Sequence, residues 1–374
     1  MTSIDPDRLI RQFMEFVQID SPSLAEAPFV SALAGELKNL GLAVENDRTG
    51  QNGAGNLFAV LPGTNPNLRP ILLSMHTDTV EPGRSIKPRL EGNRIHSDGT
   101  TILGADNKAP IAATLEVIRW LLSSRPEQGD VELLFTWGEE RGHLGAKAFD
   151  TARLRSRIGF VPDGGAPLGT IIHRAPYYDS IRAAFIGRAA HAGISPERGI
   201  SAIVMASRAV SRMKLGRISE ETTANLGKIS GGSGRNTVPE RVEIEGEARS
   251  LLLEKVEEQV QNMRSAMEDA ARETGGKVEV QVKREYDGFS VGKEEAPVKI
   301  ALAASRTAGL NPVITSTNGG SDGNDLNEKG IQTIVLGMGG QGYHSTQESI
   351  TVEELVKLAE WMGALIIEAG RQAA

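Results

Sequence analysis

The sequence predicts an α/β fold with a largely parallel sheet, into which a smaller α+β unit is inserted. In residues 1–176, and again in 286–374, short apolar runs alternate with helix-length amphipathic segments, which is the pattern of a parallel sheet with helical crossovers. In residues 177–285 the strands are instead grouped with two long helices. A chain of 374 residues is also long for one domain, so two domains are expected.

Local patterns define the elements of the main domain, 1–176 and 286–374. Asp5 and Pro6 begin a helix, because proline is well tolerated in a first helical turn, and apolar residues then recur at helical spacing as far as Val17. A second helical stripe runs from Phe29 to Leu40. Further strands are expected at 56–61, 71–75, 131–137, 158–161 and 333–336, and further helices at 107–122, 296–308 and 351–369.

The inserted domain, 177–285, is expected to be a compact unit of about 110 residues. Alternating apolar and polar residues predict a strand at 277–283, and a long amphipathic pattern predicts a helix at 253–273. The other predicted elements are strands at 178–186, 224–229 and 242–248 and a helix at 200–213.

The composition excludes several classes of protein. With 39% hydrophobic and 24% charged residues, the chain has an ordinary globular balance. A net charge of -7 disfavours nucleic acid and anionic membranes as partners. Because there are no cysteines, disulfides and thiolate metal sites are excluded, and a transition metal would be held by His, Asp and Glu.

The N-terminal segment, MTSIDPDRLIRQFMEF, does not resemble a signal peptide. Charged side chains interrupt its apolar residues, and no small-residue cleavage site follows. No apolar run approaches the roughly 18 residues of a membrane span. We therefore expect a cytosolic protein that does not bind membranes.

His76 and Asp78 end an apolar strand in ILLSMHTDTV. In open α/β sheets, sites are built at the carboxyl ends of the strands. Residues two apart lie on one face of an extended segment, so the histidine can bind a metal while the carboxylate orients it. Taken alone, this pair is better explained as an ordinary polar strand end.

Carboxylates follow other predicted strands in the same way. Glu139 and Glu140 follow VELLFTW, and Asp163 follows IGFV. Asp106 opens a helix in ILGADNKAP, and His344 lies in the glycine-rich loop GGQGYHSTQE. Each has a common explanation by itself, such as a helix cap or a solvated loop. Together they make two histidines and several carboxylates, a donor set that suits two zinc ions.

The motifs in their order along the chain resemble one family. HTDTV, GADNKAP, GEERG, PDGG, GRAAHAG, GGSGRNTVP and GYHSTQE are similar to the two-zinc exopeptidases and deacylases, and closest to their peptidase T and peptidase T-like members. The resemblance covers essentially the whole chain. It implies a zinc-exopeptidase-like catalytic domain with an inserted lid and dimerisation domain.

The resemblance also implies the ligands of two zinc ions per subunit, for which cobalt or manganese are possible substitutes. His76 and Asp163 match the ligands of one ion, and Glu140 and His344 match those of the other. Asp106 matches the carboxylate that bridges the two ions. Such a bridge needs two oxygens, because the metals of two-metal sites lie about 3.5–4 Å apart.

The catalytic roles implied by the resemblance fall on three further residues. Glu139 matches the general base, and Asp78 matches the acid that orients a ligand histidine. His191, in GRAAHAG, is similar to a lid histidine that stabilises the oxyanion across a dimer. Asn236 and Arg249 match positions that contact substrate, and Arg249 is suited to a bidentate pair with a carboxylate. A homodimer is therefore expected.

Two positions depart from the family pattern. Asn107 stands where many relatives carry a second aspartate, and Asn318 stands where peptidase T leads us to expect arginine. The second departure weakens the case for strict tripeptide specificity. His96, His143 and His173 have no partner pattern in the sequence, and we interpret them as structural or surface residues.

The expected function is hydrolysis of the amide bond of a small peptide by a zinc-activated water, most closely the aminopeptidase reaction of peptidase T. The same site also suits an N-acyl amino acid deacylase, a desuccinylase or a carboxypeptidase, because the substrate pocket is not determined by the metal ligands. A catalytically silent metal-binding protein is the third alternative. The complete set of ligands and the general base argues against it.

Overall fold

The computed structural model describes residues 3–372. The chain folds into two compact units. The first contains the described residues up to Arg174, then Ser290–Ser316 and the described residues from Ser321 on. The second contains Ala175–Phe289 and Thr317–Gly320. The predicted insertion was 177–285, and no local pattern in the sequence indicates that 317–320 belongs to the second unit.

The first unit contains a mixed nine-stranded sheet, ordered β1-β2-β6-β3-β7-β18-β8-β16 with β17 beside β8. Its centre is parallel, because β3 pairs in parallel with β6 and β7, and β18 pairs in parallel with β7. Antiparallel pairing occurs toward the margins, as between β2 and β6. The strands are β1 (Val44–Asn46), β2 (Leu57–Leu61), β3 (Ile71–His76), β6 (Val131–Thr136), β7 (Ile158–Gly164), β8 (Thr170–Ala175), β16 (Phe289–Ser290), β17 (Val313–Ser316) and β18 (Gln332–Gly337).

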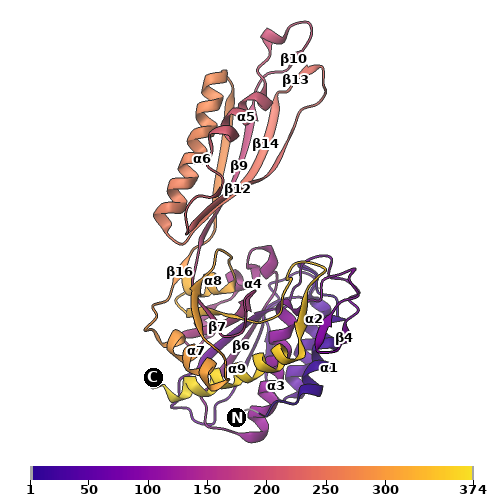
Figure 1. Ribbon diagram of the computed structural model, residues 1–374, viewed down its shortest axis with the longest axis vertical. Coiled ribbons are helices and arrows are strands. Elements are labelled where there is room, and N and C mark those ends of the chain that lie inside the picture. Colours follow the sequence, from indigo (N-terminus) through magenta and orange to yellow (C-terminus); the bar gives the residue numbers. More distant parts are fainter. Residues whose placement is uncertain (1–2, 373–374) are drawn as a thin grey trace. The chain divides into compact units, whose positions relative to one another are not determined.

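Helices cover this sheet (Figure 1). Every residue of β3 and β6 is buried, which explains why these strands are nearly continuous apolar runs with no polar face. The helices are α1 (Pro6–Val17), α2 (Ala27–Asn39), α3 (Ala105–Ser124), α4 (Leu144–Ala148), α7 (Ala296–Thr307), α8 (Asp322–Glu328) and α9 (Val352–Arg371). The α/β fold with a parallel central sheet is thus confirmed.

Capping explains where the predicted helices begin. The Asp5 side chain accepts a hydrogen bond from the Arg8 N–H at the start of α1, and Thr351 and Glu354 form a capping box at the start of α9. Several short elements were not predicted from the sequence. They include α8 and a small sheet of β4 (Arg89–Glu91), β5 (Arg94–His96) and β19 (Ser349–Thr351), which are too short to show a period.

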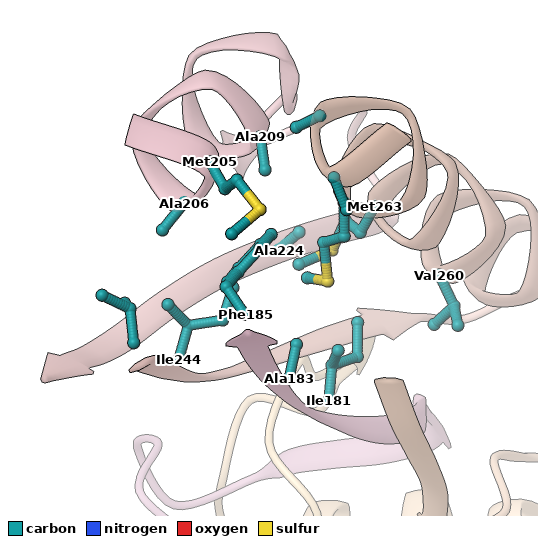
Figure 2. Packing of buried hydrophobic residues seen from close by; sticks show 14 of the residues in the cluster. Ile181, Ala183, Phe185, Met205, Ala206, Ala209, Ala224, Ile244, Val260 and Met263 are labelled. Carbon is teal, nitrogen blue, oxygen red and sulfur yellow. The ribbon is translucent and has the colours of Figure 1, made fainter. Parts of the chain in front are cut away.

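The second unit is a five-stranded antiparallel sheet, ordered β11-β12-β14-β9-β15, with two helices. Apolar side chains from β9, α5 and α6 form its own core, including Phe185, Met205 and Met263 (Figure 2). The elements are β9 (Tyr177–Ile186), α5 (Ala202–Arg212), β11 (Gly216–Arg217), β12 (Thr222–Gly231), β14 (Arg241–Ser250), α6 (Leu253–Thr274) and β15 (Lys277–Tyr286). A separate ribbon pairs β10 (Ala190–His191) with β13 (Thr237–Val238).

Among residues 3–372, no helix combines the length and the apolar character needed to cross a bilayer.

Candidate metal centre

The predicted ligands of the first unit lie at one edge of its sheet. His76 is the last residue of β3, and Asp163 lies near the end of β7. Glu140 lies in a 3-10 turn, Glu139–Arg141, that follows β6. Because β3, β6 and β7 are parallel neighbours, their carboxyl ends meet at the same edge.

Each carboxylate oxygen of Asp106 lies close to a different histidine. His76 Nε2 lies 2.9 Å from Asp106 Oδ1 and 3.4 Å from Asp163 Oδ1. His344 Nε2 lies 3.3 Å from Asp106 Oδ2 and 3.0 Å from Glu140 Oε1. The five predicted ligands therefore form one connected group, with Asp106 at its centre.

The chemistry of this group fits a divalent cation. Ligand atoms of His76, Asp106 and Glu140 lie within 4.8 Å of one another, and so do those of His76, Glu139 and Asp163. Burial, together with the charges of Asp106 and Glu140, raises the pKa of Asp163 to about 7. Three carboxylates and two imidazoles, with Glu139 beside them, make a donor set suited to borderline metals such as zinc.

Asp78 orients both His76 and the acidic turn. The main-chain oxygen of Asp78 lies 2.9 Å from His76 Nδ1, and its Oδ1 lies 3.4 Å from the same atom. If Nδ1 is the donor, Nε2 is free for a metal. The buried carboxylate also accepts hydrogen bonds from the N–H groups of Glu139 (2.9 Å) and Glu140 (3.2 Å) and from the Ser23 hydroxyl (2.7 Å).

Comparison with known proteins decides the family. Residues 72–368 match the model of the peptidase family M20/M25/M40. The chain belongs to this family.

Two solved structures and one sequence relative agree with this assignment. The aminopeptidase PepT from Bacillus cereus ATCC 10987 is 42% identical, with a TM-score of 0.92 over 98% of this chain and 99% of its own. A tripeptidase from Staphylococcus aureus is 40% identical, with a TM-score of 0.95 over 99% of this chain and 100% of its own. The uncharacterized protein YqjE of Bacillus subtilis (strain 168) is 43% identical, over 98% of this chain and 100% of YqjE. The predicted resemblance and fold class are confirmed.

A buried glutamate of this M20/M25/M40 peptidase also holds the acidic turn. Glu26 Oε1 accepts hydrogen bonds from the N–H groups of Leu24 (2.8 Å) and Gly138 (3.1 Å). Burial raises the pKa of Glu26. Glu26 and Asp78 together accept hydrogen bonds from the N–H groups of three consecutive residues, 138–140. Glu26 was not among the predicted site residues, because a glutamate just before a helix carries no distinguishing local signal.

Glu348 holds the main chain around Asp106 in the same way. Its buried carboxylate accepts hydrogen bonds from the N–H groups of Leu103 (2.7 Å), Gly104 (2.8 Å) and Asp106 (3.1 Å). Burial raises the pKa of Glu348 to about 7. Glu348 was not among the predicted site residues either, although it stands four positions after His344.

Asn107, the first departure from the family pattern, contacts the ligand group. Its Nδ2 donates to the main-chain oxygen of Pro162 (2.9 Å) and to Asp163 Oδ1 (3.0 Å). An amide at this position thus supports Asp163 without adding a negative charge.

The three histidines without a partner pattern occupy different environments. His96 and His173 are partly buried and contact main-chain oxygens, those of Ser97 and Val291. His143 is buried and lies beside Glu139, with Nε2 3.5 Å from Glu139 Oε1. The sequence contained no sign of this contact.

The remaining predicted residues belong to the second unit. His191, in β10, and Asn236, just before β13, are both exposed, and the Ala192 N–H donates to the main-chain oxygen of Asn236 (2.9 Å). Arg249, in β14, donates to Glu247 from Nε (3.1 Å) and Nη2 (3.0 Å). Arg249 Nη1 also donates to the Tyr286 hydroxyl (3.1 Å) and to the main-chain oxygen of Asn318 (3.4 Å). A bidentate pair with a substrate carboxylate would therefore replace one of these partners.

Proposed function

We propose that this protein is a two-zinc aminopeptidase that removes the N-terminal residue of small peptides. The observation that carries the proposal is the position of Asp106, whose two oxygens face His76 and His344 separately. This is the arrangement that a bridging carboxylate between two metal ions requires. The similarity to an aminopeptidase and a tripeptidase at 42% and 40% identity supports the peptide substrate.

In this proposal His76 and Asp163 hold one ion, Glu140 and His344 hold the other, and Asp106 belongs to both. When bound, the two ions supply the Lewis acidity that activates a water molecule for attack on an amide carbonyl.

Glu139 is the proposed general base. Its side chain is 9% exposed, and Glu139 begins the turn that follows β6. Burial, and then the charge of Asp163, raises the pKa of Glu139 well above that of a free glutamate. A carboxylate with raised basicity is suited to accept the proton of the water and to return it to the leaving amine.

The substrate partners belong to the second unit in this proposal. His191 donates a hydrogen bond to the oxyanion, as oxyanion-hole donors do, and it does so within a homodimer. Asn236 and Arg249 contact the substrate. The exposed positions of His191 and Asn236 leave their side chains available for such contacts.

A panel of substrates with and without metal tests the proposal. Free di-, tri- and tetrapeptides and their N-acetylated forms are incubated with chelator-treated protein, and then with added zinc, cobalt or manganese. We expect cleavage of peptides with a free amino terminus, lost on chelation and restored by metal. Full activity without metal would overturn the metal site. Cleavage of only the N-acylated forms would indicate a deacylase, and hydrolysis of neither would indicate a silent metal-binding protein.

A further inference from the structure

A buried histidine lies between Glu139 and a buried aspartate. The proposed mechanism uses neither this histidine nor this aspartate. His143 is 4% exposed, and Asp325, in α8, is 1% exposed. His143 Nδ1 lies 2.7 Å from Asp325 Oδ2, and His143 Nε2 lies 3.5 Å from Glu139 Oε1. The imidazole therefore stands between two carboxylates, one on each of its nitrogens.

The backbone brings His143 back over the turn that carries Glu139. The His143 N–H donates to the Glu139 main-chain oxygen at 2.8 Å. His143 has a φ of 57°, a left-handed conformation that is unfavourable for a residue with a side chain. Gly145, two residues on, lies so close to Trp137 that a Cβ on it would come within 2.6 Å of the Trp137 nitrogen. The loop is thus tightly folded on the residues that follow β6, and the position of the His143 backbone is restricted.

Asp325 determines the direction in which the ring points. With Nδ1 held at 2.7 Å by a buried carboxylate, rotation of the ring would leave that carboxylate without its partner, which is costly away from water. Nε2 then has one fixed position, and the atom that it faces is Glu139 Oε1.

We propose that His143, anchored by Asp325, is a positioning residue that holds the Glu139 carboxylate in its reactive orientation. This inference rests on the proposed function, because it requires Glu139 to be the general base. Neither of the two carboxylates that face the ring belongs to the five predicted metal ligands, so His143 is expected to act on turnover and not on metal binding. Misplacement of a reacting group by about 1 Å can cost about 10²-fold in rate.

Two isosteric substitutions separate the two contacts of the ring. In His143→Gln, the side-chain amide reaches the position of Nε2 and can still donate to Glu139. In His143→Asn, it reaches the position of Nδ1 and keeps only the contact with Asp325. We expect His143→Asn to lower kcat by roughly 10- to 100-fold, as is common for residues that orient a site, with KM and metal content unchanged. His143→Gln, which keeps a donor to Glu139 but loses the contact with Asp325, should have a higher kcat than His143→Asn.

The same pair of changes at His173, whose ring nitrogen contacts the Val291 main-chain oxygen, is the matched control. It measures the general effect of replacing a partly buried histidine, and both control variants should keep wild-type kcat. If His143→Asn and His143→Gln have equal kcat, or if the asparagine variant is the more active, the inference is wrong.

A double-mutant cycle with Glu139→Gln gives a second test. If His143 acts through Glu139, adding His143→Asn to Glu139→Gln should cause no further loss of the residual turnover, measured at high enzyme concentration. An equal loss in both backgrounds would overturn the inference. Asp325→Ser, which removes the anchor and leaves the ring, should show the same coupling, and it decides the question if a His143 variant does not fold. Wild-type activity in Glu139→Gln alone would instead contradict the proposed function.

Discussion

Glu139 and Glu140 are neighbours in the sequence, yet the turn directs them to different partners. Glu140 Oε1 lies 3.0 Å from His344 Nε2, whereas Glu139 Oε1 faces His143. We expect Glu139→Gln to lower turnover by at least about 10²-fold with metal content intact. Glu140→Gln should instead lower metal occupancy. Steady-state kinetics and metal analysis of the two purified variants measure both effects, and the reverse pattern would mean that their roles are exchanged.

The environment of Lys108 leads us to expect that the free energy of unfolding depends on pH. Its side chain is fully buried, and Nζ donates to the Ile19 oxygen at 2.7 Å and lies 4.5 Å from the Phe29 ring centroid. Burial lowers the pKa of Lys108 from 10.5 to about 7, against the opposing charges of Asp20 and Glu348. In the folded protein the lysine therefore loses its proton at a lower pH than in the unfolded chain.

The sign of the resulting pH dependence follows from proton binding. Between the folded pKa of about 7 and the unfolded value of 10.5, the unfolded chain binds more protons, so the free energy of unfolding rises with pH. The rise is at most about 1.4 kcal/mol per pH unit. This gain in the free energy of unfolding is complete above the unfolded pKa. It is lost as the pH falls from 10.5 to about 7.

Lys108→Met removes this titration while keeping an unbranched side chain that is one atom shorter. Denaturant unfolding of both proteins at several pH values gives the difference in their free energy of unfolding, in which the other titrating groups largely cancel. That difference should shift in favour of the wild type as the pH rises above about 7. A difference that does not change with pH would contradict a lysine that is neutral in the folded state.

At the scale of an element, the turn after β6 depends on carboxylates from other parts of the chain. Glu26→Leu leaves the Gly138 N–H without its acceptor. We expect this change to lower the free energy of unfolding by about 1–3 kcal/mol and metal affinity by about 10- to 100-fold. Glu26→Gln keeps an acceptor oxygen and should stay close to wild type. Calorimetric titration of metal into chelator-treated protein measures the affinity.

Glu132 offers a matched control for this experiment. It is also buried, and it accepts hydrogen bonds from the N–H groups of Arg155 (2.8 Å) and Ser156 (2.9 Å), which are not part of the metal centre. Glu132→Leu should reduce stability without reducing metal affinity. If Glu26→Leu also leaves metal affinity unchanged, the turn does not depend on Glu26 for its geometry.

At the scale of the whole molecule, the second unit carries His191 but none of the predicted metal ligands. β12 is an edge strand whose partner β11 covers only two of its residues, Thr223 and Ala224, and Ile229 on the same strand is 61% exposed. A bare edge of this kind can pair with the same edge of a second copy. These features support the proposed homodimer, in which each subunit supplies His191 to its partner.

Mixing two inactive variants tests this shared site. His191→Ala and Glu139→Gln should each retain metal and the dimer but lose turnover. In a mixed dimer, one site combines an intact Glu139 with the partner's His191, so subunit exchange should restore part of the activity. No restoration despite demonstrated exchange, or an active enzyme that sediments as a monomer, would mean that His191 acts within its own subunit or not at all.

The sequence by itself determined the parallel centre of the sheet, most of the long helices and the group of predicted ligands. These features are encoded locally. A buried parallel strand such as β3 is a continuous apolar run, and a strand that ends in His76 delivers that residue to the edge where its parallel neighbours also end. The order of such motifs along the chain was enough to indicate the family that the comparisons confirm.

Only the tertiary structure decided which buried groups support the ligands. Glu26 contacts Gly138 across 112 positions, Asp325 contacts His143 across 182, and Glu348 contacts Asp106 across 242. A hydrogen bond between such distant residues leaves no periodic pattern, and a buried glutamate looks in the sequence like an exposed one. Burial makes these contacts strong, because a polar group that lacks its partner away from water is costly, and burial is a property of the folded chain.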